Sequence, residues 1–211
     1  MDNSFSSFSD KDLWQQFRSG SEEAYSFMYE KYVPILYSYG YRIYPNEEVV
    51  KDCLQDLFVT LWLTRQNLGA TESIKYYLFR SLRREIAQKV NADFTFTNKT
   101  TSPFIRNAEE SFEDQLIELE ENSLQSKELD MALSYLSDRQ REAIFLRFYQ
   151  NISFEEIASI MGITQRAVYK LIYRAVDLLK KTYTPKPTPP SALPTISLIT
   201  MAIIIQTILH P

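Results

Sequence analysis

The stretch that decides the fold spans residues 153–179 and reads SFEEIASIMGITQRAVYKLIYRAVDLL. A Ser-x-x-Glu pattern starting at Ser153 predicts a capping box that begins a short helix. Gly162 can adopt the positive φ that a tight turn needs, and Thr164 can cap a second, longer helix. Ala158 supplies the small side chain where two such helices cross. The spacing therefore predicts a helix-turn-helix.

The second of these helices has two different faces. Its apolar residues recur at helical spacing and are expected to be buried. Between residues 160 and 181 there are five basic residues and one acidic residue, although the whole chain has a net charge of -4. A basic, aromatic face of this kind can read base edges and bind phosphates in the major groove, whereas the alternative is a solvated face without a ligand. The candidate DNA-binding residues are Gln165, Arg166, Tyr169, Lys170, Tyr173 and Arg174.

The composition of the whole chain favours helices and excludes several kinds of site. Only four of the 211 residues are glycine, and one cysteine (Cys53) and one histidine (His210) leave no disulfide and no zinc cluster. We find no nucleophile paired with a base and no phosphate-binding glycine loop, so we expect neither an enzyme nor a metal or other cofactor. The first residues lack a basic stretch followed by an apolar run, which predicts a cytoplasmic protein.

Hydrophobic periodicity and charge divide the chain into four parts. Residues 8–91 contain four helical stripes, residues 92–125 hold eight acidic and two basic groups, residues 126–182 contain the helix-turn-helix, and residues 183–211 are first Pro-rich and then apolar. We therefore predict an all-α fold in which two small helical domains are joined by a flexible acidic linker and followed by an apolar tail.

A third helix, capped by Asn46, carries a polar outer face that includes a tryptophan. Asp52, Gln55, Asp56 and Trp62 share this face. An exposed tryptophan beside carboxylates suits a protein interface, because rigid aromatics anchor partners and acids select a basic surface. The alternative is an ordinary hydrophilic face with an incidental aromatic residue.

Two segments together resemble a known family. Residues 136–179 look like the C-terminal promoter-binding domain of bacterial extracytoplasmic-function (ECF) sigma factors. The first domain resembles theirs in an Asp-x-x-Gln-x-x-Phe-x-x-x-Trp pattern, present here as Asp52, Gln55, Phe58 and Trp62, on the helix that docks on the clamp of RNA polymerase.

The resemblance implies a promoter-specificity subunit that is not an enzyme. Its partners would be core RNA polymerase, promoter DNA and an anti-sigma factor. The second domain would bind the minus-thirty-five element, and the first would open the minus-ten element, with the loop from Thr64 to Thr71 available for a flipped base. The implied polymerase contacts are Asp52, Gln55, Asp56, Phe58 and Trp62; the implied minus-ten contacts are Tyr76, Phe79, Arg80, Arg83 and Arg84.

Several alternatives stay open at this point. A helix-turn-helix regulator that does not join polymerase would use the N-terminal helices to dimerise or to sense a signal. The fourth-helix aromatics can also serve as core, which we expect for Tyr77, while Phe79 fits either role. For the tail, ten of the fourteen residues from Ile196 to Leu209 are apolar, which suits packing on the chain or on a partner, membrane association, or disorder.

Overall fold

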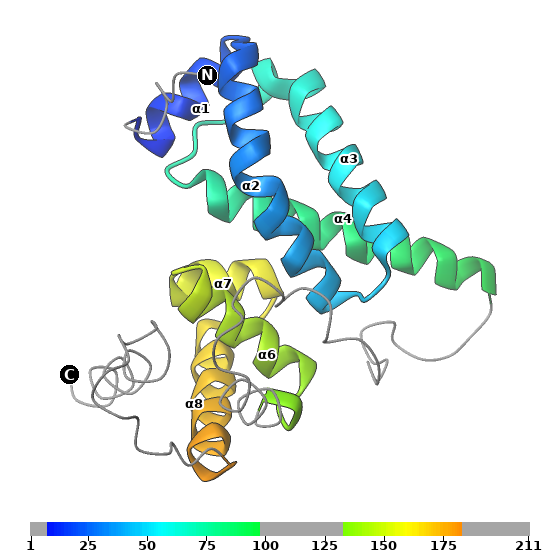
Figure 1. Cartoon of the computed structure of the whole chain (residues 1–211), viewed down its shortest axis with the longest axis vertical. Coiled ribbons are helices and arrows are strands. Elements are labelled where there is room, and N and C mark those ends of the chain that lie inside the picture. The colour runs from blue at the N-terminus through cyan, green and yellow to red at the C-terminus, as the bar shows by residue number, and fades with distance from the viewer. Residues whose placement is uncertain (1–7, 98–132, 183–211) are drawn as a thin grey trace, which may run out of the picture. The chain divides into compact units, whose positions relative to one another are not determined.

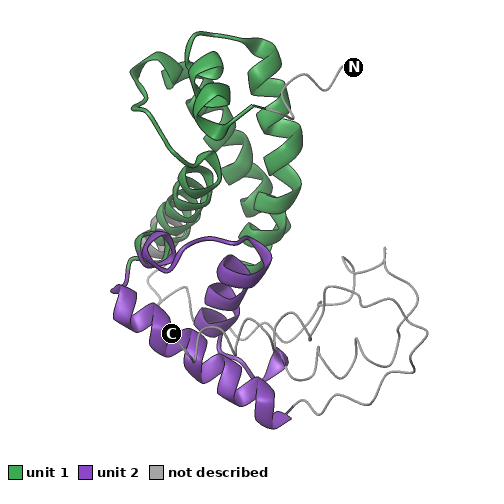
Figure 2. Cartoon of the chain, turned by 90° about the vertical axis from the view of Figure 1, so that its left-hand side faces the viewer, with its two compact units in different colours: residues 1–111, 159–162 green, residues 112–158, 163–211 purple. Residues whose placement is uncertain are grey.

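The computed structural model describes residues 8–97 and 133–182, with side chains described up to Asn91 in the first range (Figure 1). Helices and connecting turns account for the structure of these two ranges. The chain divides into two compact units, residues 1–111 with 159–162 and residues 112–158 with 163–211 (Figure 2). The prediction of an all-α chain with two helical domains is therefore confirmed. Residues 98–125 of the predicted acidic linker and the apolar tail lie outside the described residues.

The part of unit 1 that the structure describes is built from four α-helices and one short 3-10 turn. They are α1 (Asp10–Arg18), α2 (Glu22–Ile43), α3 (Glu47–Thr64), η1 (Arg65–Asn67) and α4 (Ile74–Thr97). Helix α2 continues through Pro34. Helix α4 runs into the segment that the sequence assigned to the linker, so the predicted domain end at residue 91 falls inside a helix.

The first three helices each begin at a side-chain cap, and the third begins at Asn46 as predicted. In each case a side-chain oxygen accepts a bond from the backbone N–H three residues later, which satisfies a donor that has no partner within the helix. The bonds run from Asp12 N to Ser9 Oγ (3.2 Å), from Ala24 N to Ser21 Oγ (3.1 Å) and from Val49 N to Asn46 Oδ1 (3.0 Å).

Two long-range hydrogen bonds tie α1 to the segment that precedes α4. The backbone N–H of Ile74 donates to Asp10 Oδ2 over 2.9 Å, and the Trp14 indole donates to the Gly69 carbonyl over 2.8 Å. Asp10 thus serves α4 as an N-terminal acceptor from a distant part of the chain. Burial, and secondarily the nearby Asp10 carboxylate, raise the pKa of Tyr32.

Unit 2 contains the helix-turn-helix except for residues 159–162, which the division assigns to unit 1. Its elements are α6 (Asp138–Ile144), a π-helical turn η2 (Phe145–Tyr149), α7 (Phe154–Met161) and α8 (Gln165–Thr182). Ser153 and Glu156 form the predicted capping box, with Glu156 N to Ser153 Oγ at 3.2 Å and Ser153 N to Glu156 Oε2 at 3.0 Å. Gly162 has a φ of +64°, as the predicted turn requires.

The inner face of α8 forms much of the core of unit 2. Val168, Ile172, Ala175 and Leu179 are buried as predicted, and Val176 joins them. The predicted inner residues Leu171 and Leu178 are instead half-buried. Helix α8 packs against α6, and residues on the other side of α8, such as Arg166 and Lys170, are exposed.

Within the described ranges, no helix has the length and apolar content needed to cross a bilayer.

A close helix crossing in unit 1 generates a stability prediction. A Cβ at Gly40 would lie 2.8 Å from Val50 Cγ1 and 3.4 Å from Ile86 Cδ1. Gly40→Ala should therefore lower the free energy of unfolding by about 1–3 kcal/mol in urea denaturation, because the crossing has no room for a methyl group. An alanine elsewhere in a helix would stabilise it by up to about 1 kcal/mol.

Gly69→Ala is the matched control, since no atom lies within 4 Å of its added Cβ. Equal stabilities of the two variants would contradict the tight crossing.

Candidate nucleic-acid interface and protein-binding surface

The outer side of α8 presents all six residues that the sequence singled out for DNA. We call this set the α8 outer face; each member is exposed, and the members are Gln165, Arg166, Tyr169, Lys170, Tyr173 and Arg174. Positions four apart lie on one side of a helix, so the three cations Arg166, Lys170 and Arg174 form one row. Such a row of positive charges along one side of a helix can contact the phosphates of a DNA backbone.

A layered stack holds one aromatic ring of this face. The Tyr169 ring stacks on Phe154, with centroids 4.2 Å apart and planes at 16°. On Phe154 also lies the Arg147 guanidinium, whose carbon is 4.7 Å from the ring centroid. Arg147 is itself held by a hydrogen bond of 3.2 Å to the Ile152 carbonyl. Tyr169 is therefore oriented before any ligand binds.

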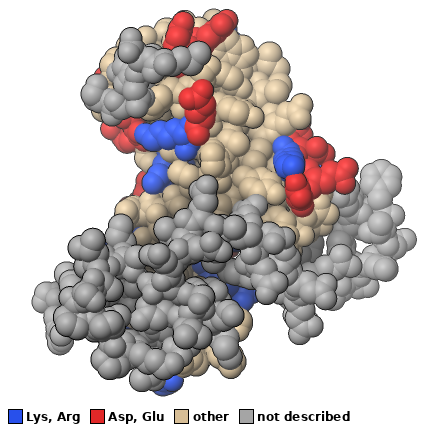
Figure 3. Space-filling model, viewed as in Figure 1, with Lys and Arg blue, Asp and Glu red and all other residues tan. Residues whose placement is uncertain are grey.

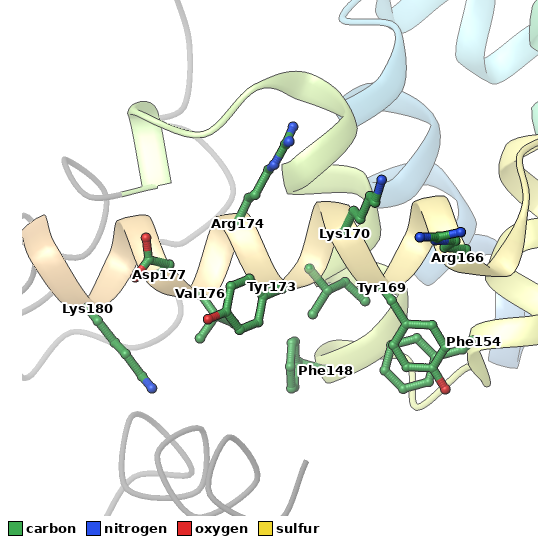
Figure 4. Close-up of a pocket in the computed structure, with 11 residues that line it drawn as sticks. Phe148, Phe154, Arg166, Tyr169, Lys170, Tyr173, Arg174, Val176, Asp177 and Lys180 are labelled. Carbon is green, nitrogen blue, oxygen red and sulfur yellow. The ribbon is translucent and has the colours of Figure 1, made fainter. Parts of the chain in front are cut away.

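A hollow of about 470 Å³ runs along α8 beside these rings (Figure 4). In the view of Figure 4, the rings of Phe148, Phe154 and Tyr169 lie below the α8 ribbon and the Tyr173 ring lies in front of it, while Lys170 and Arg174 extend above it. Lys170 and Arg174 therefore extend away from the rings of Phe148 and Phe154, whereas Lys180 extends on the same side as these rings. The sequence pattern did not indicate this hollow, because Phe148 comes from the separate turn η2.

On α3, the predicted acidic pair is exposed and contacts a lysine of α4. Lys89 Nζ lies 3.0 Å from Asp52 Oδ2 and 3.9 Å from Asp56 Oδ2. The hydrogen bond that Lys89 donates to the Asp52 carboxylate raises the pKa of Lys89. Figure 3 shows basic side chains next to acidic ones on the visible face of unit 1 in the same way. The two carboxylates thus already have a cationic neighbour.

Trp62 is half-buried in an aromatic cluster rather than freely exposed. Its ring centroid lies 5.0 Å from that of Tyr25 and 6.4 Å from that of Phe17. The Arg65 guanidinium carbon lies 4.0 Å from the Trp62 centroid, within cation–π range. The ring therefore has a fixed position, with part of its surface accessible.

Phe58 cannot contact polymerase directly in this structure, which corrects its place among the implied contacts. Its side chain is buried, and its ring packs edge-on against Tyr29 at 5.0 Å. Tyr25 donates its hydroxyl hydrogen to the Phe58 carbonyl over 3.2 Å. Phe58 supports α3 from the inside, as its position on the apolar stripe indicates.

Two exposed apolar residues next to the acidic pair were missed by the sequence reasoning. Val59 is 48% exposed and Leu63 is 73% exposed. With Gln55 they are spaced four apart, and this α3 strip (Asp52, Gln55, Asp56, Val59 and Leu63) lies on one side of the helix. Apolar residues at such spacing on an otherwise polar face were the available signal.

The implied minus-ten residues on α4 differ in how far their side chains are exposed. Arg80 and Arg84 are exposed, and Arg83 and Tyr76 are half-buried. Arg80 Nη1 donates to the Tyr76 hydroxyl over 3.2 Å. Phe79 is fully buried with its ring centroid 4.8 Å from that of Tyr39, so the expectation that it stacks on a base is wrong.

Tyr77, expected in the core, is half-buried, and its ring centroid lies 5.0 Å from that of Trp14.

Comparisons with known proteins match both units to one family. The family model described as Sigma-70 region 2 matches residues 28–92, and the one described as Sigma-70, region 4 matches residues 126–179. Together the two matches cover more than half of the chain.

Curated relatives carry the same assignment. The ECF RNA polymerase sigma factor BldN of Streptomyces coelicolor is 26% identical over 179 residues, which are 81% of this chain and 64% of BldN. The RNA polymerase sigma factor YlaC of Bacillus subtilis is 26% identical over 159 residues, which are 74% of this chain and 90% of YlaC. The chain thus spans less than two thirds of BldN but most of YlaC.

Solved structures share the fold at low sequence identity. The structure of CnrH in complex with the cytosolic domain of CnrY has a TM-score of 0.54 and 22% identity, over 82% of this chain and 95% of that chain. The sigma factor RpoE in complex with the anti-sigma factor NepR from Bartonella quintana has a TM-score of 0.53 and 20% identity, over 76% and 96%.

The order of the two units and the two family matches define a sigma-70-type transcription initiation factor. Within that class, the chain belongs to the ECF sigma factors, as the resemblance in the sequence implied.

The stack under Tyr169 yields a prediction. Phe154→Leu should remove the ring that holds Tyr169 and lower the stability of unit 2 by about 0.5–1.5 kcal/mol, the usual value of an aromatic pair. It should also weaken the binding of duplex DNA in a fluorescence anisotropy titration, because Tyr169 would lose its orientation. Phe154→Tyr, which keeps the ring, should restore both. Wild-type behaviour of the leucine variant would contradict the stack as a support.

Proposed function

We propose that the two units of this sigma factor divide the work of promoter recognition. Through the α8 outer face, unit 2 binds the minus-thirty-five element, while unit 1 binds core polymerase through the α3 strip and the minus-ten element through α4. The observation that carries the proposal is the joint exposure of six polar, aromatic and cationic residues on α8, opposite the buried stripe.

For the minus-thirty-five element, the cationic row gives affinity and the neighbouring side chains give sequence preference. Arginine and lysine neutralise phosphates without regard to sequence. Gln165 lies in the first turn of α8 and can pair with an adenine edge, while an arginine can pair with guanine. The hollow flank adds aromatic surface for thymine methyl groups.

For polymerase, the α3 strip offers apolar area beside two carboxylates. Leu63 and Val59 would enter apolar recesses of the partner, and Asp52 and Asp56 would select a basic rim. A cation of the polymerase clamp would then bind beside Lys89 or replace it. Trp62 contributes its accessible edge and keeps the C-terminal turn of α3 in place.

For the minus-ten element, the basic side of α4 remains after Phe79 is removed from the set. Arg80, Arg83 and Arg84 would contact the strand, and Tyr76 supplies the ring on which an unpaired base can stack. The hydrogen bond from the Trp14 indole to the Gly69 carbonyl fixes the loop from Thr64 to Thr71. A flipped base would bind against this loop.

An anti-sigma factor is a further partner that we propose. Two solved structures of similar fold, CnrH and RpoE, are complexes with CnrY and with the anti-sigma factor NepR. A regulator of this kind would cover the α3 strip or the α8 outer face. We also propose that the protein acts in the cytoplasm without enzymatic activity, with domains at residues 8–97 and 126–182.

The α8 assignment predicts a separation of two affinities. Arg166→Ala or Lys170→Ala should weaken promoter binding of the holoenzyme by about 1–3 kcal/mol and leave the affinity for core polymerase unchanged. Lys181→Ala is the control, because this lysine is exposed on the same helix but pairs with Asp177. If all three variants bind promoter as the wild type does in a gel-shift titration, α8 does not read the element.

The α3 assignment predicts the converse pattern. Leu63→Glu should reduce capture of core polymerase at least tenfold, on the order of 1.4 kcal/mol, because a charge would enter an apolar recess. Circular dichroism should remain native, since 73% of Leu63 is exposed. Trp62→Ala is a poorer choice because it also removes ring packing.

Gln16→Glu on α1 adds the same charge at an exposed position away from the strip and should bind polymerase normally. Undiminished capture by the Leu63 variant would sink the α3 assignment.

A further inference from the structure

We propose that the apolar segment 195–209 of this same chain docks into the hollow along α8 and competes with promoter DNA there. The inference rests on the proposed function of the α8 outer face, because it assigns a regulation to that face. The segment 195–209 lies outside the described residues, and the surface that would receive it is described in unit 2.

The receiving surface carries aromatic side chains that are exposed to water. Tyr173 is 63% exposed and Tyr169 is 46% exposed, and both line the hollow of about 470 Å³ together with Phe148 and Val176. Charged side chains also line it, namely Arg166, Lys170, Arg174, Asp177 and Lys180. Hollows of this volume lined by rings typically bind an apolar group. In Figure 4 the rings of Phe148, Phe154 and Tyr169 lie below α8, away from the ends of Lys170 and Arg174, and Lys180 extends on the side of these rings.

The segment has the chemistry that such a surface accepts. From Ile196 to Leu209 there are ten apolar residues and no charged residue. An exposed run of this kind is expected to find apolar cover. As a helix, fifteen residues would extend about 22 Å, which is short of the hydrocarbon core of about 30 Å. Cover within the protein is therefore favoured over a membrane crossing.

The connection is long enough and leaves from the right place. Helix α8 ends at Thr182, close along the helix to the lining residues Val176 and Lys180. Twelve residues separate that end from Thr195, and a Pro-rich spacer reaches about 3.1 Å per residue, or about 37 Å. The distance back along α8 from Thr182 to Tyr169 is about 20 Å at 1.5 Å per residue.

Tethering favours this occupant over a separate partner. A short linker gives an effective concentration on the order of millimolar, so that even weak apolar contacts are populated. Because Tyr169 and Tyr173 belong both to the hollow and to the α8 outer face, the docked segment and DNA exclude one another. The apparent affinity for DNA is then reduced by the fraction of molecules in which the hollow is open.

Paramagnetic relaxation tests the docking without any DNA. A nitroxide at Met201→Cys, in a full-length chain carrying Cys53→Ser, should broaden the amide signals of Phe148, Tyr173 and Val176. Adding Ile204→Asn and Ile208→Asn should abolish the broadening, because polar amides do not enter an aromatic hollow. Unbroadened unit 2 signals in the labelled wild-type segment overturn the proposal, as does broadening that survives the two asparagines.

DNA affinity tests the competition. With a short fluorescein-labelled duplex at low salt, the two-asparagine variant should bind more tightly than the wild type, by about tenfold if about nine-tenths of the wild-type molecules are closed. Asparagine adds no charge, so electrostatic attraction to DNA stays the same. Phe148→Ala should act in the same direction from the other side of the contact. Equal affinities of all three chains overturn the competition.

Two further measurements separate this inference from its alternatives. Flotation with neutral phosphatidylcholine vesicles should leave the wild-type chain unbound, and capture by vesicles would overturn the proposal in favour of a membrane anchor. Capture of core polymerase reports on the proposed function alone. If the chain binds polymerase but shows no relaxation effect, the docking is contradicted and the proposed function stands. If it shows the relaxation effect but does not bind polymerase, the sigma-factor assignment of the surfaces is contradicted and the docking stands.

Discussion

Both units depend on the same constraint, which is that each helix has to bury its apolar stripe against its neighbours. In α8 the stripe that contains Val168, Ile172 and Ala175 is buried, and this alone determines that Arg166, Lys170 and Arg174 face outward. A shift of the stripe by one residue would turn the cationic row by about 100°. The DNA-binding candidates are therefore set by packing that they do not take part in, and the same applies to the α3 strip opposite Phe58 and Leu61.

The local part of this arrangement was predictable from the sequence, and the long-range part was not. Caps at Ser9, Ser21 and Ser153 act between residues three apart, so a short pattern contains all the partners. In contrast, Asp10 accepts from Ile74 and Lys89 contacts Asp52 across tens of residues. Such contacts depend on how helices are placed, and no periodicity encodes them.

The candidate sites show the same difference. Periodicity gave the full α8 outer face, because exposure on an amphipathic helix follows from the positions of its apolar residues. Phe58 lies on the apolar stripe of α3, and only the family pattern implied a polymerase contact for it; its burial agrees with its place on the stripe. Phe79 lies at the edge of the α4 stripe, where one residue of rotation decides between core and solvent. Only the packing against Tyr39 settles its position.

In the α3 strip, the charged residues would provide specificity for a partner and the apolar residues would provide affinity. The pairs between Lys89 and the two carboxylates are largely exposed, and exposed pairs contribute about 0–1 kcal/mol, so a partner's cation can replace Lys89 at little cost. Exposed charges of this kind mainly guide approach and orientation. Most of the affinity would then have to come from burying Val59 and Leu63. Their apolar side chains are exposed to water in the free protein, so burying them lowers the free energy. Asp52, which belongs to the family pattern, and its neighbour Asp56 would thus choose the partner, and the apolar residues Val59 and Leu63 would hold it.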